Sequence, residues 1–242
     1  MSTALLLVRG VSKRFRGLAA VRDVSFAVPR GAIFALIGPN GAGKTTMFNM
    51  IAGMLRPDAG AIALAGLSLV GKRPDVICRA GVGRTFQIVR PFRGMTVEEN
   101  VTVGALVWTN DVAAARAHAR EVLELLELAG KRSAEVHSLT LPDRKRLEVA
   151  RALATKPKLL LLDEAMAGLR PTEVDRMLGL LRYLNAAHGL TILLIEHVMH
   201  AVMALAQHVI VLHHGEIIAA GSPGEVTRDR AVLDSYLGEA LP

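Results

Sequence analysis

The feature that most constrains this chain is the nine-residue segment Gly-Pro-Asn-Gly-Ala-Gly-Lys-Thr-Thr at positions 38–46. An apolar run at 32–37 precedes it and predicts a buried strand, and residues 45–53 predict a helix. Because glycines let backbone N–H groups approach a phosphate and lysine adds positive charge, this pattern predicts a phosphate-binding loop at a helix N-terminus. The residues expected around the phosphates are Gly38, Pro39, Asn40, Gly41, Ala42, Gly43, Lys44, Thr45 and Thr46, and the hydroxyl of Thr45 is expected to face Mg²⁺.

Composition indicates a folded globular protein that does not cross a membrane. Its 242 residues, 51% of them apolar, are enough for one substantial core. The longest apolar runs, such as 32–37 and 159–162, are far shorter than the ~20 residues of a membrane-spanning helix. The run at 5–8 is too short for a secretory signal. Cys78 is the single cysteine, which excludes an internal disulfide and favours the cytosol.

The formal charge of +7 suits two classes of partner, nucleic acid and an anionic membrane face. For stacking on bases the chain has six phenylalanines, two tyrosines and one tryptophan, and its basic residues are spread along the sequence. We therefore expect residence at a membrane surface and no nucleic-acid partner.

Periodicity predicts an α/β protein with a mostly parallel sheet and two additions. Alternating stretches at 5–28 predict antiparallel strands that are joined by a turn near Gly17 and form a small β-rich edge, and residues 61–70 predict further short strands. From 92 to 129 the pattern becomes helical, with apolar residues clustered on one side of 112–128, which predicts a helical insertion. Further helices are expected at 144–153 and 173–187, and further buried strands at 159–162 and 190–195.

Two carboxylates follow the predicted strand at 159–162. Asp163 and Glu164 stand at its carboxyl end, where open α/β sheets bind ligands. An aspartate there can hold Mg²⁺, and the adjacent glutamate can orient or deprotonate the water that attacks a terminal phosphate. The alternative, a solvated acidic turn, is disfavoured by the phosphate loop upstream.

Two further side chains are candidates for the same edge of the sheet. His197 follows the strand at 190–195 and could sense the terminal phosphate, although a histidine after a strand is more often a surface or cap residue. Gln87, in the segment Thr85-Phe86-Gln87, has an amide that could bind Mg²⁺ or the attacking water, although by itself it is a loop residue.

The motifs GPNGAGKTT, TFQ, LLLLDE and EH, in this order, resemble the ATP-binding subunits of ABC transporters. The resemblance covers almost the whole chain. It is greatest to the ATPase subunits of branched-chain amino-acid importers, in the segments GRTFQIVRPFRGMTVEENV, RKRLEVARAL and MAGLRPTE and in the ending Tyr236-Leu237-Gly238.

This resemblance implies a P-loop NTPase core, a mostly parallel sheet with flanking helices, together with an antiparallel β subdomain and a helical subdomain. The implied organisation is one ABC ATPase domain over 1–242. Its core and β subdomain occupy about 1–87 and 158–242, and its helical subdomain, which carries the signature segment, occupies about 88–157.

The resemblance also implies roles for single residues in binding ATP with Mg²⁺ and hydrolysing the ATP. Glu164 takes the general-base role, His197 the switch-histidine role, and Gln87 the role that links Mg²⁺ to the membrane partner. Lys44 completes the catalytic set, and Phe15 matches the aromatic residue that stacks on adenine. The residues implied to bind nucleotide are Phe15, the loop at 38–46, Gln87, Thr140 and Asp163, and those implied to bind Mg²⁺ are Thr45, Gln87 and Asp163.

The chain departs from the family pattern in the signature segment at 139–143. In the family, each phosphate loop faces a serine- and glycine-rich signature of the partner subunit. Here Leu141 and Pro142 stand where at least one glycine is usual, and proline has no N–H to donate. Thr140 and Asp143 are also spaced as a helix-capping pair. We therefore predict that the helix start is kept and that the contact with the γ-phosphate is weakened.

These features predict an importer motor, in which a head-to-tail pair of ATPase subunits closes on ATP and moves permease helices near Gln87. The weakened signature, and Arg170 in place of an aspartate in the loop after Glu164, favour a heterodimer with a different ATPase subunit; a homodimer is the alternative. The expected location is the cytoplasmic face of the inner membrane, as a peripheral subunit beside permease subunits and, indirectly, a periplasmic binding protein.

The expected cargo is branched-chain amino acids, and urea, amides, aromatic acids and lipid export are the alternatives. Reading the cargo from this chain is difficult because other subunits recognise it. A soluble ATPase acting on ribosomes or DNA is disfavoured, because the chain has one cassette and no sustained heptads.

Overall fold

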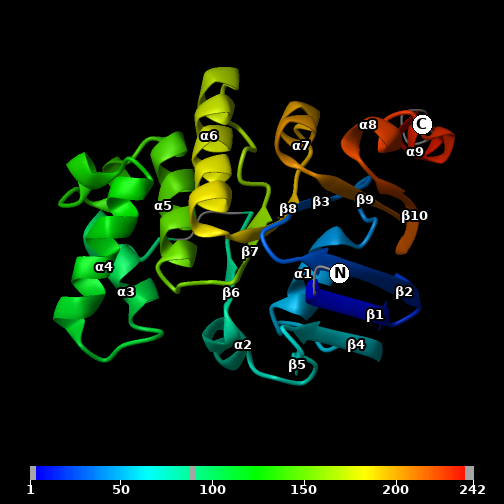
Figure 1. The fold of residues 1–242 in the computed structure, drawn as a ribbon, viewed down its shortest axis with the longest axis horizontal. Coiled ribbons are helices and arrows are strands. Elements are labelled where there is room, and N and C mark those ends of the chain that lie inside the picture. The colour runs from blue at the N-terminus through cyan, green and yellow to red at the C-terminus, as the bar shows by residue number, and fades with distance from the viewer. Residues whose placement is uncertain (1–3, 88–90, 238–242) are drawn as a thin grey trace.

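The phosphate loop follows an inner strand of a six-stranded sheet in the computed structural model, which describes residues 4–87 and 91–237. The strand order is β10-β9-β3-β8-β7-β6 (Figure 1). The strands are β3 (Ile33–Ile37), β6 (Val82–Arg84), β7 (Leu159–Asp163), β8 (Thr191–Ile195), β9 (His208–His213) and β10 (Glu216–Gly221). Neighbours pair in parallel except β9 and β10, which pair antiparallel. The mostly parallel sheet expected from the sequence is therefore confirmed.

The inner strands are buried on both faces, which explains their unbroken runs of apolar residues. In β3, Ile33, Ala35 and Ile37 belong to one hydrophobic core. Phe34 and Leu36 belong to the other. Because side chains alternate along a strand, this short segment anchors both cores and holds the start of the phosphate loop in place.

A second, antiparallel sheet has the order β2-β1-β4-β5. Its strands are β1 (Ala4–Phe15), β2 (Leu18–Pro29), β4 (Ala59–Leu64) and β5 (Leu67–Ser68). Phe15 pairs with Leu18 across the turn that the sequence predicts near Gly17. Helix α1 (Lys44–Ile51) lies between the two sheets (Figure 1), and its Phe48 is buried in the core that both sheets share.

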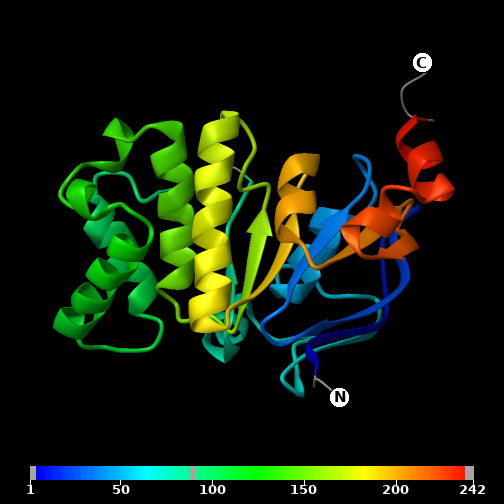
Figure 2. The same ribbon diagram turned by 45° about the horizontal axis from the view of Figure 1, so that its top comes forward.

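Helices α6 (Pro171–His188) and α7 (Met199–Leu205) cover the opposite face of the six-stranded sheet, as Figure 2 shows. Leu181 of α6 and Val202 of α7 share a core with Ile192 and Leu194 of β8. The sheet is thus sandwiched between α1 on one side and these two helices on the other.

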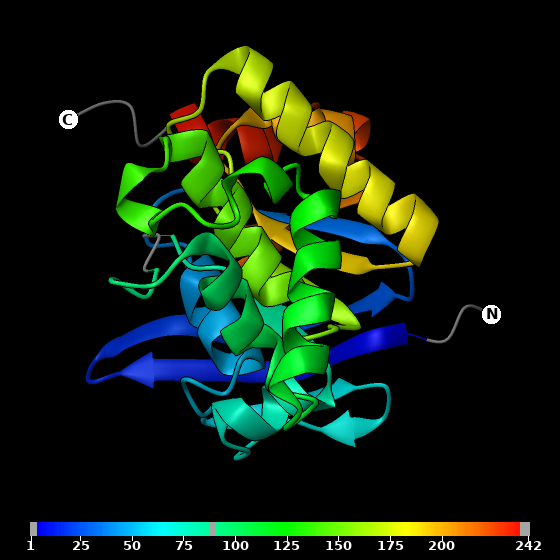
Figure 3. The same ribbon diagram turned by 90° about the vertical axis from the view of Figure 1, so that its left-hand side faces the viewer.

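Three helices stand together beyond the β6 edge of the sheet, at the left of Figure 1 and toward the viewer in Figure 3. They are α3 (Val97–Ala105), α4 (Val112–Leu125) and α5 (Leu141–Leu153). Thr96, Asp111 and Thr140 cap them, each through a side-chain oxygen that accepts a backbone N–H. Two 3₁₀ turns, Ala129–Lys131 and Val136–Ser138, connect α4 to α5. A helical insertion is present, while the subdomain boundaries near 87 and 158 stay a prediction.

Several boundaries differ from the expected ones for local reasons. Helix α5 begins at Leu141 rather than at 144, because Thr140 caps it and Pro142 is accommodated in the first turn. The sequence periodicity did not predict three short helices, which are α2 (Pro74–Ala80), α8 (Pro223–Val226) and α9 (Arg230–Leu237). Residues 88–90 after Gln87 and Gly238 of the final motif lie outside the described residues. Over the described ranges, the longest apolar helices fall short of what a bilayer crossing requires.

Trp108, two residues after the C-cap of α3, packs against the end of α5. Its indole Nε1 donates a hydrogen bond of 3.1 Å to the carbonyl oxygen of Ala154, the C-cap residue of α5. The ammonium of Lys156 lies 3.4 Å from the ring centroid. Both partners belong to the turn that leads from α5 into β7, so the indole connects the end of α3 with this turn.

Candidate functional site

The phosphate loop can adopt its shape only because glycine stands at its two most crowded positions. Gly38 has φ +143° and Gly43 has φ +102°, which L-residues rarely adopt. A Cβ on Gly38 would lie 2.0 Å from the carbonyl oxygen of Leu212, and one on Gly43 would lie 2.3 Å from that of Ala20. The backbones of β9 and β2 therefore press against the loop from two sides. These contacts explain physically why glycine is needed at both positions.

Lys44 begins α1 and holds the loop from within. Its Nζ donates hydrogen bonds to the carbonyl oxygens of Gly38, at 2.6 Å, and Pro39, at 2.7 Å. The residue is buried, whereas Thr45 and Gly41 of the same loop are exposed. A buried ammonium and a helix N-terminus give this loop the positive electrostatic character that favours an anion.

Three side chains expected at the carboxyl edge of the sheet meet there. The carboxylate of Glu164 accepts a hydrogen bond of 2.8 Å from Nε2 of Gln87 and lies 2.9 Å from Nε2 of His197. These residues come just after β6, β7 and β8, which are neighbours in the sheet. Glu164 has φ +51°, and its carbonyl oxygen accepts a hydrogen bond of 2.8 Å from Nζ of Lys145. Glu164 is thus held at both its backbone and its carboxylate.

A cleft of about 390 Å³ connects these side chains with the phosphate loop. Phe15, which ends β1, and Leu18, which begins β2, line it as well, and Phe15 is 42% exposed. An exposed aromatic ring beside this glycine-rich loop is suited to stacking on a nucleotide base. The lining residues are Phe15, Leu18, Ala20, Asn40, Gly41, Ala42, Gly43, Lys44, Thr45, Thr46, Gln87, Glu164 and His197.

Asp163 lies behind this cleft and is buried next to an arginine that sequence reasoning missed. Nη2 of Arg84 donates a hydrogen bond of 3.1 Å to Oδ2 of Asp163, and the hydroxyl of Thr85 accepts one of 3.1 Å from the Asp163 N–H. Burial raises the pKa of Asp163, while the hydrogen bond and charge of Arg84 oppose that rise. Burial lowers the pKa of Arg84, and the ion pair opposes that change. The ion pair therefore offsets part of the cost of ionising this buried carboxylate, while the pKa of Asp163 stays raised overall.

Glu196, directly before His197, is a second buried acid that sequence reasoning did not single out. Its Oε1 accepts a hydrogen bond of 2.9 Å from the Met166 N–H, while Oε2 is buried without a hydrogen-bond partner. Burial raises the pKa of Glu196 to about 6. Through its hydrogen bond with Met166, Glu196 fixes the loop that follows Glu164 against the end of β8.

Thr140 of the signature segment does not line this cleft, while Leu141 lines a neighbouring cavity together with Gln87 and Glu164. Thr140 caps α5, and its hydroxyl donates a hydrogen bond of 2.7 Å to Oδ2 of Asp143. Asp143 is buried and pairs with Lys131 and, at 2.6 Å, with Arg146. Burial opposes ionisation of Asp143, but the hydrogen bonds from Lys131 and Thr140 outweigh it and lower its pKa. The cleft lining includes all the other predicted site residues except Gly38, Pro39 and Asp163, and Thr140 lines a different cavity.

The residues present fit Mg²⁺ bound together with a nucleotide. Thr45, Gln87 and Asp163 offer hydroxyl, amide and carboxylate oxygens, the ligand types that Mg²⁺ prefers. Across the described residues, no three His, Cys, Asp or Glu side chains gather as a metal site. A divalent ion here would therefore depend on phosphate oxygens for part of its coordination, as is usual for Mg²⁺ with nucleotides.

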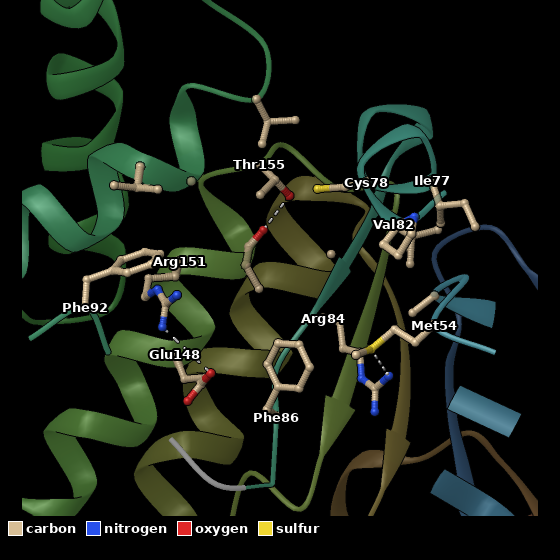
Figure 4. Close-up of a pocket in the computed structure, with 17 residues that line it drawn as sticks. Met54, Ile77, Cys78, Val82, Arg84, Phe86, Phe92, Glu148, Arg151 and Thr155 are labelled. Carbon is tan, nitrogen blue, oxygen red and sulfur yellow. Dashed lines mark hydrogen bonds and ion pairs between the residues drawn. The ribbon is translucent and has the colours of Figure 1, made fainter. Parts of the chain in front are cut away.

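A second cavity, which we name the side groove, opens between α2, β6, α3 and α5 and has a volume of about 300 Å³ (Figure 4). Exposed Met54, Phe86 and Phe92 contribute apolar surface to it. The guanidinium of Arg151 lies 4.6 Å from the ring centroid of Phe92. The side groove is lined by Ala52, Met54, Pro74, Ile77, Cys78, Val82, Gly83, Arg84, Phe86, Phe92, Val103, Gly104, Val107, Glu148, Arg151, Ala152 and Thr155.

Comparison with known proteins assigns the family. A family model described as ABC transporter matches residues 21–167. The chain belongs to the ABC transporter family. The high-affinity branched-chain amino acid transport ATP-binding protein BraF of Pseudomonas aeruginosa is 39% identical over 99% of this chain and 100% of BraF. Its counterpart LivG of Escherichia coli (strain K12) is 40% identical over 99% of this chain and 100% of LivG.

Solved structures agree with this assignment. The ADP conformation of MJ1267, an ATP-binding cassette of an ABC transporter, is 30% identical and has a TM-score of 0.89, over 98% of this chain and 99% of that chain. The predicted family and the P-loop NTPase fold are therefore confirmed, and this chain is an ABC ATPase that binds nucleotide.

Proposed function

We propose that this ABC ATPase hydrolyses ATP in the cleft between the phosphate loop and Glu164, and that the hydrolysis energises import of branched-chain amino acids through a membrane permease. The proposal rests on one observation: the side chains of Gln87, Glu164 and His197 meet beside the phosphate loop. These three side chains stand where the terminal phosphate of a loop-bound nucleotide would meet water.

In this proposal the phosphate loop binds the nucleotide, and the side chains at the carboxyl edge of the sheet promote hydrolysis. Lys44 and the loop amides hold the phosphates and stabilise the charge that develops on them, and Phe15 stacks on the adenine. Glu164 orients the attacking water and accepts its proton. Mg²⁺, held by Thr45, Gln87 and Asp163, would neutralise charge on the phosphate oxygens.

Gln87 and His197 have a second task, because both hold the carboxylate of Glu164 in this structure. Each must give up its contact when Glu164 engages water. Gln87 can then turn toward Mg²⁺ and His197 toward the γ-phosphate. Nucleotide binding thereby rearranges the residues next to the side groove, since Phe86 precedes Gln87.

We assign the side groove to a helix of the permease. Met54, Phe86 and Phe92 provide apolar contacts, and the adjacent Glu148 and Arg151 are 4.0 Å apart and provide polar ones. This placement makes the cassette a peripheral subunit on the cytoplasmic face of the inner membrane, with a periplasmic binding protein acting on the far side. Branched-chain amino acids are the proposed cargo because BraF and LivG, which match over their full length, carry that description.

The signature segment supports pairing with a different ATPase subunit. Pro142 has no N–H, and Asp143 is held by Lys131 and Arg146, so this segment is poorly suited to a partner's γ-phosphate. We propose that the intact signature of a second subunit completes the phosphate loop of this chain. Full-rate ATP hydrolysis by the isolated chain as a homodimer would overturn that pairing. Pro142→Gly should raise turnover at the partner's loop in a mixed pair.

The catalytic assignment is tested with Glu164→Gln in the assembled transporter. ATP turnover should be lost, while binding of a fluorescent ATP analogue should persist, because the loop is untouched. Glu124→Gln, which changes an exposed carboxyl on α4, is the matched control and should keep both. Preserved turnover in Glu164→Gln would remove Glu164 from the mechanism. The cargo is tested by uptake of labelled leucine, isoleucine and valine against urea and aromatic acids.

A further inference from the structure

Arg84, the last residue of β6, lies where three parts of the molecule meet. Its Nη1 donates a hydrogen bond of 2.7 Å to Oδ1 of Asn49 in α1, and its Nη2 donates one of 3.1 Å to Oδ2 of Asp163 at the end of β7. The Arg84 side chain is only 8% exposed. The planar guanidinium thus joins the helix that follows the phosphate loop to the carboxylate behind the cleft.

The same guanidinium is in contact with the side groove. Its Nη1 lies 3.4 Å from the sulfur of Met54, and its Cζ lies 5.1 Å from the ring centroid of Phe86. Both side chains are about half exposed and line the groove (Figure 4). A protein segment that binds in the side groove would therefore contact Met54 and Phe86, the two side chains that pack against the Arg84 guanidinium.

The position and charge of Arg84 allow it to set the orientation of the Asp163 carboxylate. A buried guanidinium fixed by one neutral and one ionic hydrogen bond has little freedom to turn. Asp163 receives its Arg84 contact at Oδ2 and a backbone tether from Thr85, so the direction of its carboxylate is set by this frame. Lysine could keep the charge, but it lacks the fork that reaches Asn49 and Asp163 at once.

We propose that Arg84 is a positioning residue for divalent-ion binding: it orients Asp163 toward the nucleotide-bound metal ion and connects that carboxylate with the side groove. The inference rests on the proposed metal role of Asp163. Arg84 itself touches neither the nucleotide nor the ion. It acts through Asp163, in the same way that an outer partner orients a metal ligand.

The test measures Mn²⁺ affinity in the presence of a non-hydrolysable ATP analogue, from the electron paramagnetic resonance signal of free Mn²⁺, on the full chain. Arg84→Lys should weaken Mn²⁺ binding about tenfold, the effect of losing one charge-assisted hydrogen bond. Binding of the analogue without a divalent ion should be unchanged, which a general structural defect would not allow. Arg120→Lys, in which another arginine that donates two hydrogen bonds to a carboxylate, that of Glu98, loses its forked guanidinium, is the matched control and should bind Mn²⁺ as the wild type does.

Two further variants separate the possible failures. If Asp163→Asn binds Mn²⁺ normally, the metal role of Asp163 is wrong. If Asp163→Asn is weakened and a folded Arg84→Lys is not, only the role of Arg84 is wrong. Asn49→Ala, which removes one anchor of the guanidinium, serves if Arg84→Lys fails to fold and should also weaken Mn²⁺ binding.

The connection with the groove is tested by Phe86→Ala, which removes the exposed ring beside the guanidinium. Weaker Mn²⁺ binding with unchanged metal-free analogue binding supports the connection. Normal Mn²⁺ binding in Phe86→Ala, beside weakened binding in Arg84→Lys, overturns the connection.

Discussion

Neutralising Glu196 should change how the stability of this cassette depends on pH. Glu196 is buried, one of its carboxylate oxygens has no hydrogen-bond partner, and its pKa is raised to about 6 from an ordinary value of 4.5. The folded state therefore binds a proton more tightly than the unfolded chain does. Stability is greatest below the unfolded pKa and is lost as the pH rises through the folded one.

The size of the effect follows from the shift of Glu196. At pH 8 the ionised, buried carboxylate costs about 2 kcal/mol relative to a group with no shift, and at pH 5 it costs about 0.8 kcal/mol. Glu196→Gln removes this pH-dependent part. The stability of the variant relative to the wild type should therefore increase by about 1.2 kcal/mol between pH 5 and pH 8. For 242 residues this corresponds to about 2.5 °C in the melting temperature.

The assay is thermal unfolding of wild type and Glu196→Gln at half-unit steps from pH 5 to pH 8, in one buffer system at constant ionic strength. Glutamine introduces a constant offset, because its amide also needs a partner, so the slope with pH is the quantity to compare. Glu124→Gln, the exposed control, should run parallel to the wild type. A difference between Glu196→Gln and wild type that stays constant from pH 5 to pH 8 would refute the reasoning.

Three other perturbations have clear expected outcomes. Gly38→Ala should abolish binding of a fluorescent ATP analogue, because its Cβ would lie 2.0 Å from a carbonyl oxygen, while Gly17→Ala, which meets nothing within 4 Å, should bind normally. Burial raises the pKa of Cys78, so iodoacetamide should alkylate this single cysteine slowly at pH 7 and faster beyond pH 9. The bound permease should slow the alkylation further. An alkylation rate that does not change with pH would contradict this prediction. Asp143→Asn leaves Lys131 and Arg146 without their shared carboxylate and should lower the urea-unfolding free energy at pH 7 by about 3 kcal/mol, a loss that shrinks in acid because the pKa of Asp143 is lowered.

The central strands and the phosphate loop could be predicted from the sequence because local chemistry dictates both. Parallel strands buried on two faces leave apolar runs, and a loop pressed between β9 and β2 leaves glycines at fixed positions. Since parallel strands end at one edge of a sheet, the meeting of Glu164 and His197 also followed from the order of the motifs.

The partners of Arg84 could not be predicted in the same way. Asn49 and Asp163 are 35 and 79 residues away in the sequence, and only the packing of α1 against β6 and β7 brings them together. The sequence around an arginine at the end of a strand does not distinguish a solvated side chain from a buried one. Glu196 was missed for a similar reason, since its burial depends on the loop around Met166. Helix α2 has seven residues, too few for its periodicity to be distinctive.

The indole of Trp108 gives this cassette a built-in optical reporter. It is the single tryptophan of the chain, and it is held between the end of α3 and the turn that leads from α5 into β7. A shift between the end of α3 and this turn changes the hydrogen bond to Ala154 and the place of the Lys156 ammonium above the ring. Intrinsic fluorescence therefore follows this one joint during the nucleotide cycle, and no label needs to be attached.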